Sequence, residues 1–195
     1  MMEARKSAFF LLAAACLVLL AACQGPGRAG RPDESLQNAE TPDMVRWTYL
    51  PGGLTVNLEA DAELNLYMDR PHNLMLCVYQ LSGPDAFQKL AEEIEGIRKL
   101  LVCAPFDTTV VQAERRFVFP GEQAALVMDR MEGARYVGLV AGYNEIQPGT
   151  ATTLHAFPVI ERSRSLRPWS KTYHPGKLIA HIVLGARSLQ TIGVD

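Results

Sequence analysis

Residues 74–81 read Leu74-Met75-Leu76-Cys77-Val78-Tyr79-Gln80-Leu81. A mostly apolar run of this length is typical of a central strand in a sandwich. Upstream, Leu54, Val56 and Leu58 alternate with polar residues, which predicts a strand with one buried face. The chain therefore begins its folded part with two strands.

Further short runs downstream extend the β pattern. The predicted strands cover residues 108–112, 115–119, 124–128, 135–143, 153–160, 178–184 and 188–194. Turn residues separate some of them, at 119–122 and 147–149. About eight or nine strands with intervening turns favour a sandwich over repeated strand–helix–strand units. The polar stretch 161–177 reads as a long connection before the last strands.

One segment has helical periodicity. Phe87, Leu90, Ile94, Ile97 and Leu101 recur at helical spacing, with charged residues on the other face. The spacing predicts a single amphipathic helix inserted at about residues 84–102. The fold class expected is thus mainly β, a two-sheet β-sandwich with a short helical insertion.

The N-terminus has the features of a lipoprotein signal. Arg5 and Lys6 precede an apolar run, and Leu20-Ala21-Ala22-Cys23 matches the bacterial lipobox. The apolar run is short for a transmembrane anchor, and an ordinary secretory signal does not require a cysteine at the first mature position. Cys23 is therefore the predicted lipidation site, and Gln24 after it indicates sorting to the outer membrane.

These features predict the domain organisation. Residues 1–22 are a lipoprotein signal peptide, 23–43 a flexible tether that begins with acylated Cys23, and 44–195 the β-sandwich domain. The tether is rich in Gly and Pro, and about twenty such residues span roughly 25 Å. The membrane contact is the covalent lipid, and no other cofactor is expected.

Composition and motifs exclude several function classes. The net charge is −2, which gives no indication of nucleic-acid binding. The sequence lacks a nucleophile elbow, a phosphate-binding loop and zinc-protease spacing, so we expect neither an enzyme, a metal site nor a small-molecule substrate. Asp129 and Arg130 read as surface charges at a strand end.

Cys77 and Cys103 remain as a possible disulfide once Cys16 and Cys23 are assigned to the N-terminal segment. An extracytoplasmic compartment permits a disulfide, but two buried free thiols fit the apolar context equally well.

Several motifs in order resemble one family. Leu64-Asn65, the run from Leu74 to Leu81, Phe87, the turn 119–122 and the run 134–143 look like the lipoprotein component of type VI secretion systems, the TssJ (SciN-like) family. The resemblance implies a transthyretin-like sandwich and a structural role. It implies an outer-membrane lipoprotein, held in the inner leaflet and facing the periplasm, that tethers the periplasmic domain of the inner-membrane protein TssM.

The resemblance also implies that the loop between the first two strands contacts that partner. The candidate partner-binding residues are Asn65, Tyr67, Met68, Asp69, Arg70, Pro71 and His72. Tyr, Met and Arg are enriched in interface cores, and a proline limits the ordering cost of docking. From the residues alone, an ordinary hairpin loop that folds back onto the core is the other interpretation.

A second hypothesis is a periplasm-facing lipoprotein that binds a small ligand or a cell-wall glycan. Exposed aromatic residues commonly line such sites. Trp47 and Trp169 are the only tryptophans, and both fall outside the predicted strands.

Overall fold

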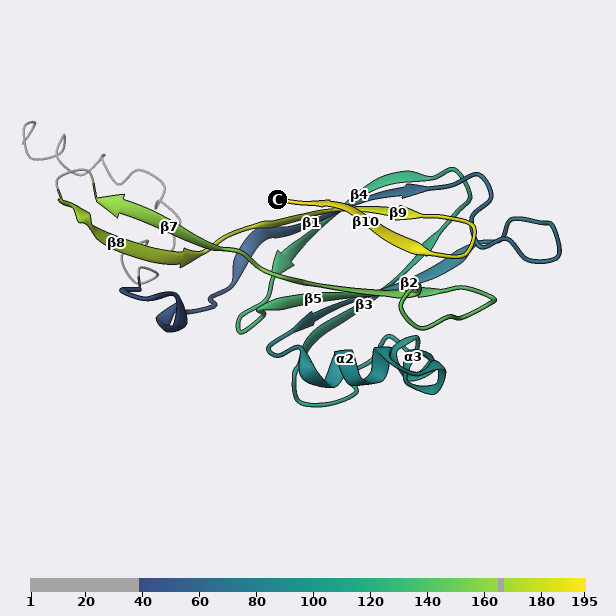
Figure 1. Cartoon of the computed structure of the whole chain (residues 1–195), viewed down its shortest axis with the longest axis horizontal. Coiled ribbons are helices and arrows are strands. Elements are labelled where there is room, and N and C mark those ends of the chain that lie inside the picture. Colours follow the sequence, from purple (N-terminus) through teal and green to yellow (C-terminus); the bar gives the residue numbers. More distant parts are fainter. Residues whose placement is uncertain (1–38, 165–166) are drawn as a thin grey trace, which may run out of the picture. The chain divides into compact units, whose positions relative to one another are not determined.

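The computed structural model describes residues 39–164 and 167–195, without the side chains of 164–170 (Figure 1). The predicted signal peptide, Cys23 and most of the tether lie outside the described residues. The described part contains ten strands and two short α-helices. The expectation of a mainly β sandwich with a helical insertion is confirmed.

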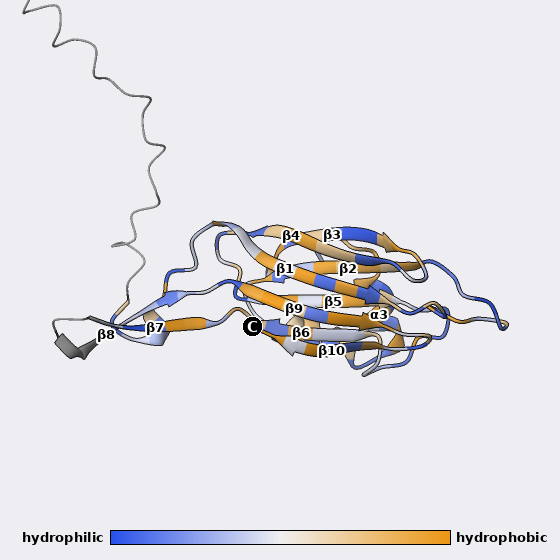
Figure 2. Cartoon of the chain, turned by 90° about the horizontal axis from the view of Figure 1, so that it is seen from above, coloured by the Kyte–Doolittle hydropathy of each residue, from blue (hydrophilic) through white to orange (hydrophobic). Residues whose placement is uncertain are grey.

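The first sheet has the strand order β10-β9-β1-β4. It consists of β1 (Leu50–Ala60), β4 (Gln123–Arg130), β9 (Leu178–Leu184) and β10 (Leu189–Val194). β1 pairs in parallel with β9, and the other two pairings are antiparallel. The parallel register sets Leu54 opposite Leu178 and Leu58 opposite Ile182, all buried. Hydropathy alternates along these strands because one face packs on the core (Figure 2).

The second sheet has the order β3-β2-β5-β6 and is antiparallel throughout. It consists of β2 (Leu74–Leu81), β3 (Val110–Val118), β5 (Tyr136–Gly142) and β6 (Thr152–Ala156). β2 is central and covered on both faces. Gln80 points toward β4, where it bonds the Asp129 carbonyl at 2.7 Å, whereas Tyr79 bonds the Leu100 carbonyl at the end of the second helix. Burial on both faces explains the unbroken apolar run.

The helical insertion consists of two helices rather than one. α2 spans Asp85–Ala91 and α3 spans Ile94–Leu100. They pack closely at Gly96, where a Cβ atom would lie 2.0 Å from the Leu90 carbonyl oxygen. The expectation of a single helix is therefore wrong, because Glu93 is extended and interrupts the helix before α3 begins.

Three strand boundaries differ from the sequence expectation. Residues 108–119 hold one strand, β3, because a single ladder with β2 runs through the predicted gap. The predicted strand 153–160 ends at Phe157-Pro158, where β6 gives way to β7 (Val159–Arg164). The predicted connection 161–177 contains β8 (Arg167–Pro175), which pairs with β7 as a separate two-stranded ribbon. Cross-strand polar pairs such as Lys171–Glu161, at 2.9 Å, replace an apolar pattern there.

The first described residues pair with this ribbon. The backbone of Ala39 makes two hydrogen bonds with that of Tyr173, of 2.8 and 2.9 Å. A short 3-10 helix, η2 (Pro42–Met44), follows before β1. None of the helices among residues 39–164 and 167–195 is long and apolar enough to cross a bilayer.

Candidate functional site

The β1–β2 loop, residues 61–73, carries the predicted partner-binding residues. Its base is fixed by Asn65, which is only 4% exposed. Asn65 Nδ2 donates to the Asn73 carbonyl at 3.0 Å, and Asn65 Oδ1 accepts from the Asn144 backbone N–H at 2.8 Å. Its φ of 50° lies in the left-handed region that Asn tolerates better than most residues. Asn65 therefore supports the loop from below and presents little surface to a partner.

Backbone bonds to neighbouring turns hold the loop further. Leu66 N donates to the Ala186 carbonyl at 2.8 Å, in the turn between β9 and β10. His72 N donates to the Leu64 carbonyl at 2.9 Å, which closes the loop across its own base. The fully buried Leu64 side chain adds an apolar anchor. The loop is thus pre-organised, so docking a partner loses less conformational entropy than ordering a free loop would.

The tip is a tight two-residue turn. Tyr67 N donates to the Arg70 carbonyl at 2.9 Å, and Arg70 N donates to the Tyr67 carbonyl at 3.1 Å. Met68 and Asp69 between them have φ values of 49° and 54°, as the mirror-image type I′ turn requires. Asn and Gly favour these positions, whereas a methionine there is strained by roughly 1–2 kcal/mol. Strain of this kind gathers at functional sites.

The tip displays apolar surface. Met68 is 76% exposed and Tyr67 is 39% exposed. The Tyr67 ring lies edge-on to the His72 ring, 6.2 Å between centroids, and His72 Nδ1 lies 2.9 Å from the Arg70 carbonyl. Asp69, Arg70 and Pro71 are exposed beside them. The alternative in which Tyr67 and Met68 fold back onto the core is therefore wrong, because both side chains are exposed.

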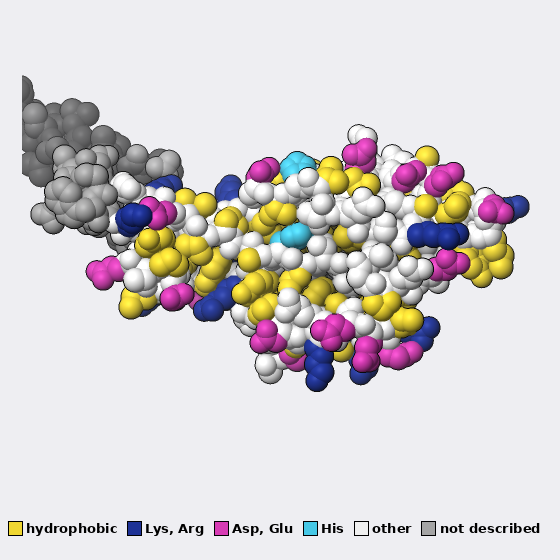
Figure 3. Space-filling model, viewed as in Figure 1, with side chains coloured by type: hydrophobic (Ala, Val, Ile, Leu, Met, Phe, Trp, Pro, Cys, Tyr) yellow, Lys and Arg dark blue, Asp and Glu magenta, His cyan; other side chains and the backbone are white. Residues whose placement is uncertain are grey.

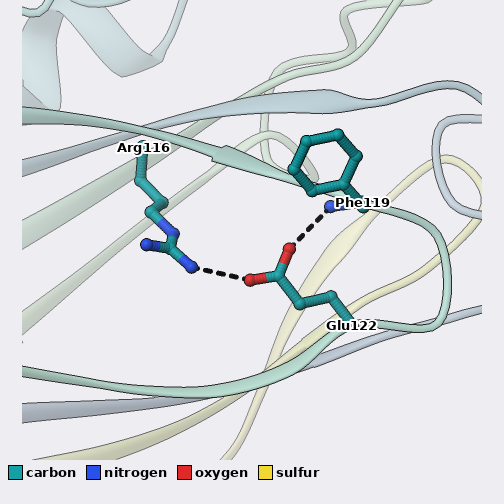
Figure 4. A network of polar contacts seen from close by, with 3 residues as sticks. All are labelled: Arg116, Phe119 and Glu122. Atoms are coloured by element: carbon teal, nitrogen blue, oxygen red, sulfur yellow. Dashed lines mark hydrogen bonds and ion pairs between the residues drawn. The ribbon is translucent and has the colours of Figure 1, made fainter.

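The β3–β4 turn lies beside the base of this loop, as the bond from Gly121 N to the Asp61 carbonyl at 3.1 Å shows. The Glu122 carboxylate accepts from Phe119 N at 2.9 Å and from the Arg116 guanidinium at 2.7 Å (Figure 4). These bonds, the Phe119 N–H foremost, hold the pKa of Glu122 below its usual range. They also orient Phe119, whose side chain is 54% exposed.

Phe119 is an exposed aromatic residue at this end of the sandwich. From the sequence it belongs to the end of a predicted strand and to the turn 119–122, and it is not among the predicted site residues. The sequence feature that could have indicated this role is an aromatic residue directly before Pro120-Gly121, because β-turns do not favour an aromatic residue at that position. Phe117, two residues earlier on β3, is 56% exposed.

Cys77 and Cys103 form a disulfide, with their Cα atoms 5.4 Å apart. It joins β2 to the segment after α3 and so fastens the helices to the second sheet. Tyr79 lies two residues along β2, with its ring edge-on to those of Phe87 and Phe106. Cys23 and the side chain of Trp169 lie outside the described residues.

Arg130 is buried, so the expectation of a surface charge at this position is wrong. Its side chain is 1% exposed and stacks on Trp47 and Phe157, with centroid distances of 5.4 and 5.6 Å. Its guanidinium donates to the Gly176 carbonyl at 2.8 Å and the Thr48 carbonyl at 2.9 Å. Desolvation lowers the pKa of Arg130 to about 10. These two carbonyls offset part of the cost of burying the guanidinium. They come from segments distant in the chain, so the local sequence around Arg130 does not predict its burial.

Among the residues that the structure describes, no group of three or more His, Cys, Asp or Glu side chains is arranged to hold a metal ion. The acidic and basic side chains on the face drawn in Figure 3 are intermingled. The arrangement offers a pre-organised tip for binding, with exposed Tyr67 and Met68 beside charged Asp69 and Arg70.

Comparison with known proteins gives a consistent result. The family model described as "Type VI secretion lipoprotein, VasD, EvfM, TssJ" matches residues 53–174. No curated protein sequence matches the chain.

Three solved structures share the fold. The T6SS lipoprotein TssJ1 from Pseudomonas aeruginosa has 18% identity and a TM-score of 0.54, with 74% of this chain and 95% of that chain covered. Serratia marcescens Lip, a membrane-bound component of the type VI secretion system, has 20% identity and a TM-score of 0.54, with 72% and 96% covered. A chain of a structure described as the TssM C-terminal domain from EAEC has 16% identity and a TM-score of 0.53, with 72% and 97% covered.

Proposed function

Because this chain belongs to the type VI secretion lipoprotein family that includes TssJ, we propose that it is the lipid-anchored structural component of a type VI secretion membrane complex. In this role it tethers the periplasmic domain of the inner-membrane protein TssM to the outer membrane. The lipid on Cys23 provides the anchor in the inner leaflet, and the sandwich faces the periplasm. The protein works by binding and carries out no catalysis.

The observation that carries the proposal is the tip of the β1–β2 loop. Met68 and Tyr67 are held outward by a turn that is bonded to itself and to the sandwich below. Exposed apolar side chains on a pre-organised tip cost solvation free energy in isolation, and covering them with a partner recovers that cost. Arg70 and Asp69 at its rim add charges that can select the partner.

A binding titration tests the partner. The full chain in detergent micelles is titrated with the periplasmic region of the TssM protein from the same organism, by calorimetry. We expect saturable binding that weakens by about tenfold or more for Met68→Ala, as at interface residues with large truncation effects. Met44→Ala is the matched control, because Met44 is 66% exposed outside the loop. Absence of binding by the folded protein, or equal weakening by both variants, contradicts the proposal.

The anchor is tested separately. Cys23→Ala removes the predicted acylation site, so we expect the protein to leave the membrane fraction and type VI secretion to stop, with an unchanged circular dichroism spectrum. Cys16→Ala is the control, because that residue lies within the predicted signal peptide. Normal membrane fractionation of Cys23→Ala argues against the lipid anchor without affecting the loop assignment.

A further inference from the structure

The outer edge of β6 is open. β6 pairs only with β5, at the end of the second sheet. The bonds from Phe157 N to the Arg135 carbonyl and from Ala141 N to the Ala151 carbonyl set the phase of this ladder. Hydrogen-bonded positions alternate in antiparallel pairs, so the N–H and C=O groups of Thr152 and Leu154 point away from β5. No strand of the described residues pairs with β6 itself along that edge. Just before β6, Leu189 N at the start of β10 donates to the Thr150 carbonyl at 2.8 Å, so the free edge begins at Thr152.

This edge lacks the usual protection. Proteins blunt exposed strand edges with charged residues or proline, and residues 152–156 contain neither. The opposite edge strand of the same sheet, β3, carries Glu114, Arg115 and Arg116 in succession. An uncharged open edge is a ready template for another strand.

A groove runs beside the open edge. It has a volume of about 520 Å³ and lies between α2 and β6. Its lining includes Phe87, Ala91, Glu92, Pro148, Thr152 and Leu154. The side chains of Thr153 and His155 contact Thr191 of β10, at 3.2 and 3.1 Å. The groove is lined by Thr152 and Leu154, with Thr153 between them. Figure 3 shows acidic and basic side chains at the lower edge of the molecule, over α2 and α3.

We propose that this groove and the β6 edge together bind an extended segment of a partner protein, which adds to the sheet as a further strand. Backbone bonds to Thr152 and Leu154 supply affinity, and alternate side chains of the segment enter the groove. Phe87, Ala91 and Leu154 favour an apolar side chain there. Glu92 is the one charged residue of the groove lining, so it favours a lysine or arginine next to that side chain.

This surface does not include the β1–β2 loop, so the proposal stands whatever that loop binds. The probe is a short acetylated peptide in which valine alternates with threonine, with one central lysine. Fluorescence anisotropy measures its binding to the full chain in detergent micelles. The same peptide, N-methylated at alternate amides, keeps its side chains but cannot donate to the strand edge. We expect the methylated peptide to bind about tenfold more weakly or worse.

Two variants locate the site. Thr152→Pro removes an outward N–H and spares the ladder with β5, since proline is tolerated where the N–H faces solvent. Ala91→Arg fills the groove. We expect each to weaken the unmethylated peptide about tenfold, and Lys89→Ala, on the exposed side of α2, to leave it unchanged.

Failure of the unmethylated peptide to bind the folded wild-type protein at millimolar concentration overturns the proposal. Equal binding of the two peptides, or equal binding to wild type and to Ala91→Arg, also overturns it. Ala91→Arg and the methylated peptide keep the test decisive if Thr152→Pro does not fold.

Discussion

Asn65 and Asn144 lie 79 positions apart in sequence, and the Asn65 side chain accepts the Asn144 backbone N–H at 2.8 Å. The same Oδ1 atom lies 3.2 Å from Asn144 Nδ2. This relationship fastens the β1–β2 loop to the segment after β5, and the bond from Asn65 Nδ2 to Asn73 closes the loop. The exposed tip of the candidate site depends on this buried base.

Asn65→Ala is therefore expected to lower the free energy of unfolding by about 2–4 kcal/mol, because it removes these bonds and places alanine at positive φ. Urea denaturation measures the change. Asn144→Ala is the control, since it keeps the backbone N–H, and we expect a loss of about 0.5 kcal/mol. Equal losses for the two variants count against this account of the loop base.

Met68→Gly separates stability from binding. Glycine adopts positive φ freely, so we expect the free energy of unfolding to stay within about 1 kcal/mol of wild type. Affinity for TssM, if the proposed function holds, falls about tenfold or more because the exposed thioether side chain is lost. Asp69→Gly gives the same backbone freedom and keeps Met68. If Met68→Gly binds TssM with wild-type affinity, the Met68 side chain is not part of the interface.

The Cys77–Cys103 disulfide closes a loop with a sequence separation of 26. A bond across a loop of this size is worth about 3–4 kcal/mol in the chain-entropy model. The double variant Cys77→Ala/Cys103→Ala is expected to lose about this much stability in thermal and urea unfolding. Reductant lowers the wild-type midpoint and leaves the double variant unchanged. A wild-type midpoint indifferent to reductant speaks against a structural disulfide.

The Glu122 carboxylate predicts an acid dependence of stability. Its folded-state pKa lies below the unfolded value of about 4.5, so its contribution is present above that pH and is lost as the pH falls through the folded pKa. Glu122→Gln is expected to cost about 1 kcal/mol at neutral pH. The difference in unfolding free energy between Glu122→Gln and wild type becomes smaller at acid pH, because Glu122 is then protonated in both the folded and the unfolded wild-type protein. Glu63→Gln is the control for the loss of one negative charge. If the stability difference between Glu122→Gln and wild type does not change with pH, the Glu122 carboxylate does not make the proposed contribution.

Arg130→Lys tests the buried guanidinium. A single ammonium group cannot bond both the Thr48 and Gly176 carbonyls, and it loses the planar stacking on Trp47. We expect a loss of about 2–4 kcal/mol in the free energy of unfolding. Arg135→Lys, at an exposed position, is the control, with a change within about 0.5 kcal/mol. Similar effects for the two variants indicate that the carbonyl bonds contribute little.

Much of the sandwich could be predicted because apolar residues recur at every second position along strands such as β1. Leu54, Val56 and Leu58 of β1 all face the core in register with β9. The β7–β8 ribbon was missed because polar cross-strand pairs such as Lys171–Glu161 stabilise it without an apolar pattern. The helix break was missed because periodicity continues across Glu92-Glu93, and the close approach at Gly96 appears only in three dimensions.

The mainly β class, the central strand Leu74–Leu81, the helical segment and the family resemblance all follow from the sequence, because these features rest on local periodicity and on motif order. Which candidate residues are exposed to a partner follows from the tertiary structure alone. The tertiary structure buried Asn65 beneath the β1–β2 loop, exposed Met68 at the tip, and surrounded Arg130 with aromatic rings and carbonyls. The exposure of a side chain depends on backbone bonds and packing from segments distant in the chain, which no local pattern encodes.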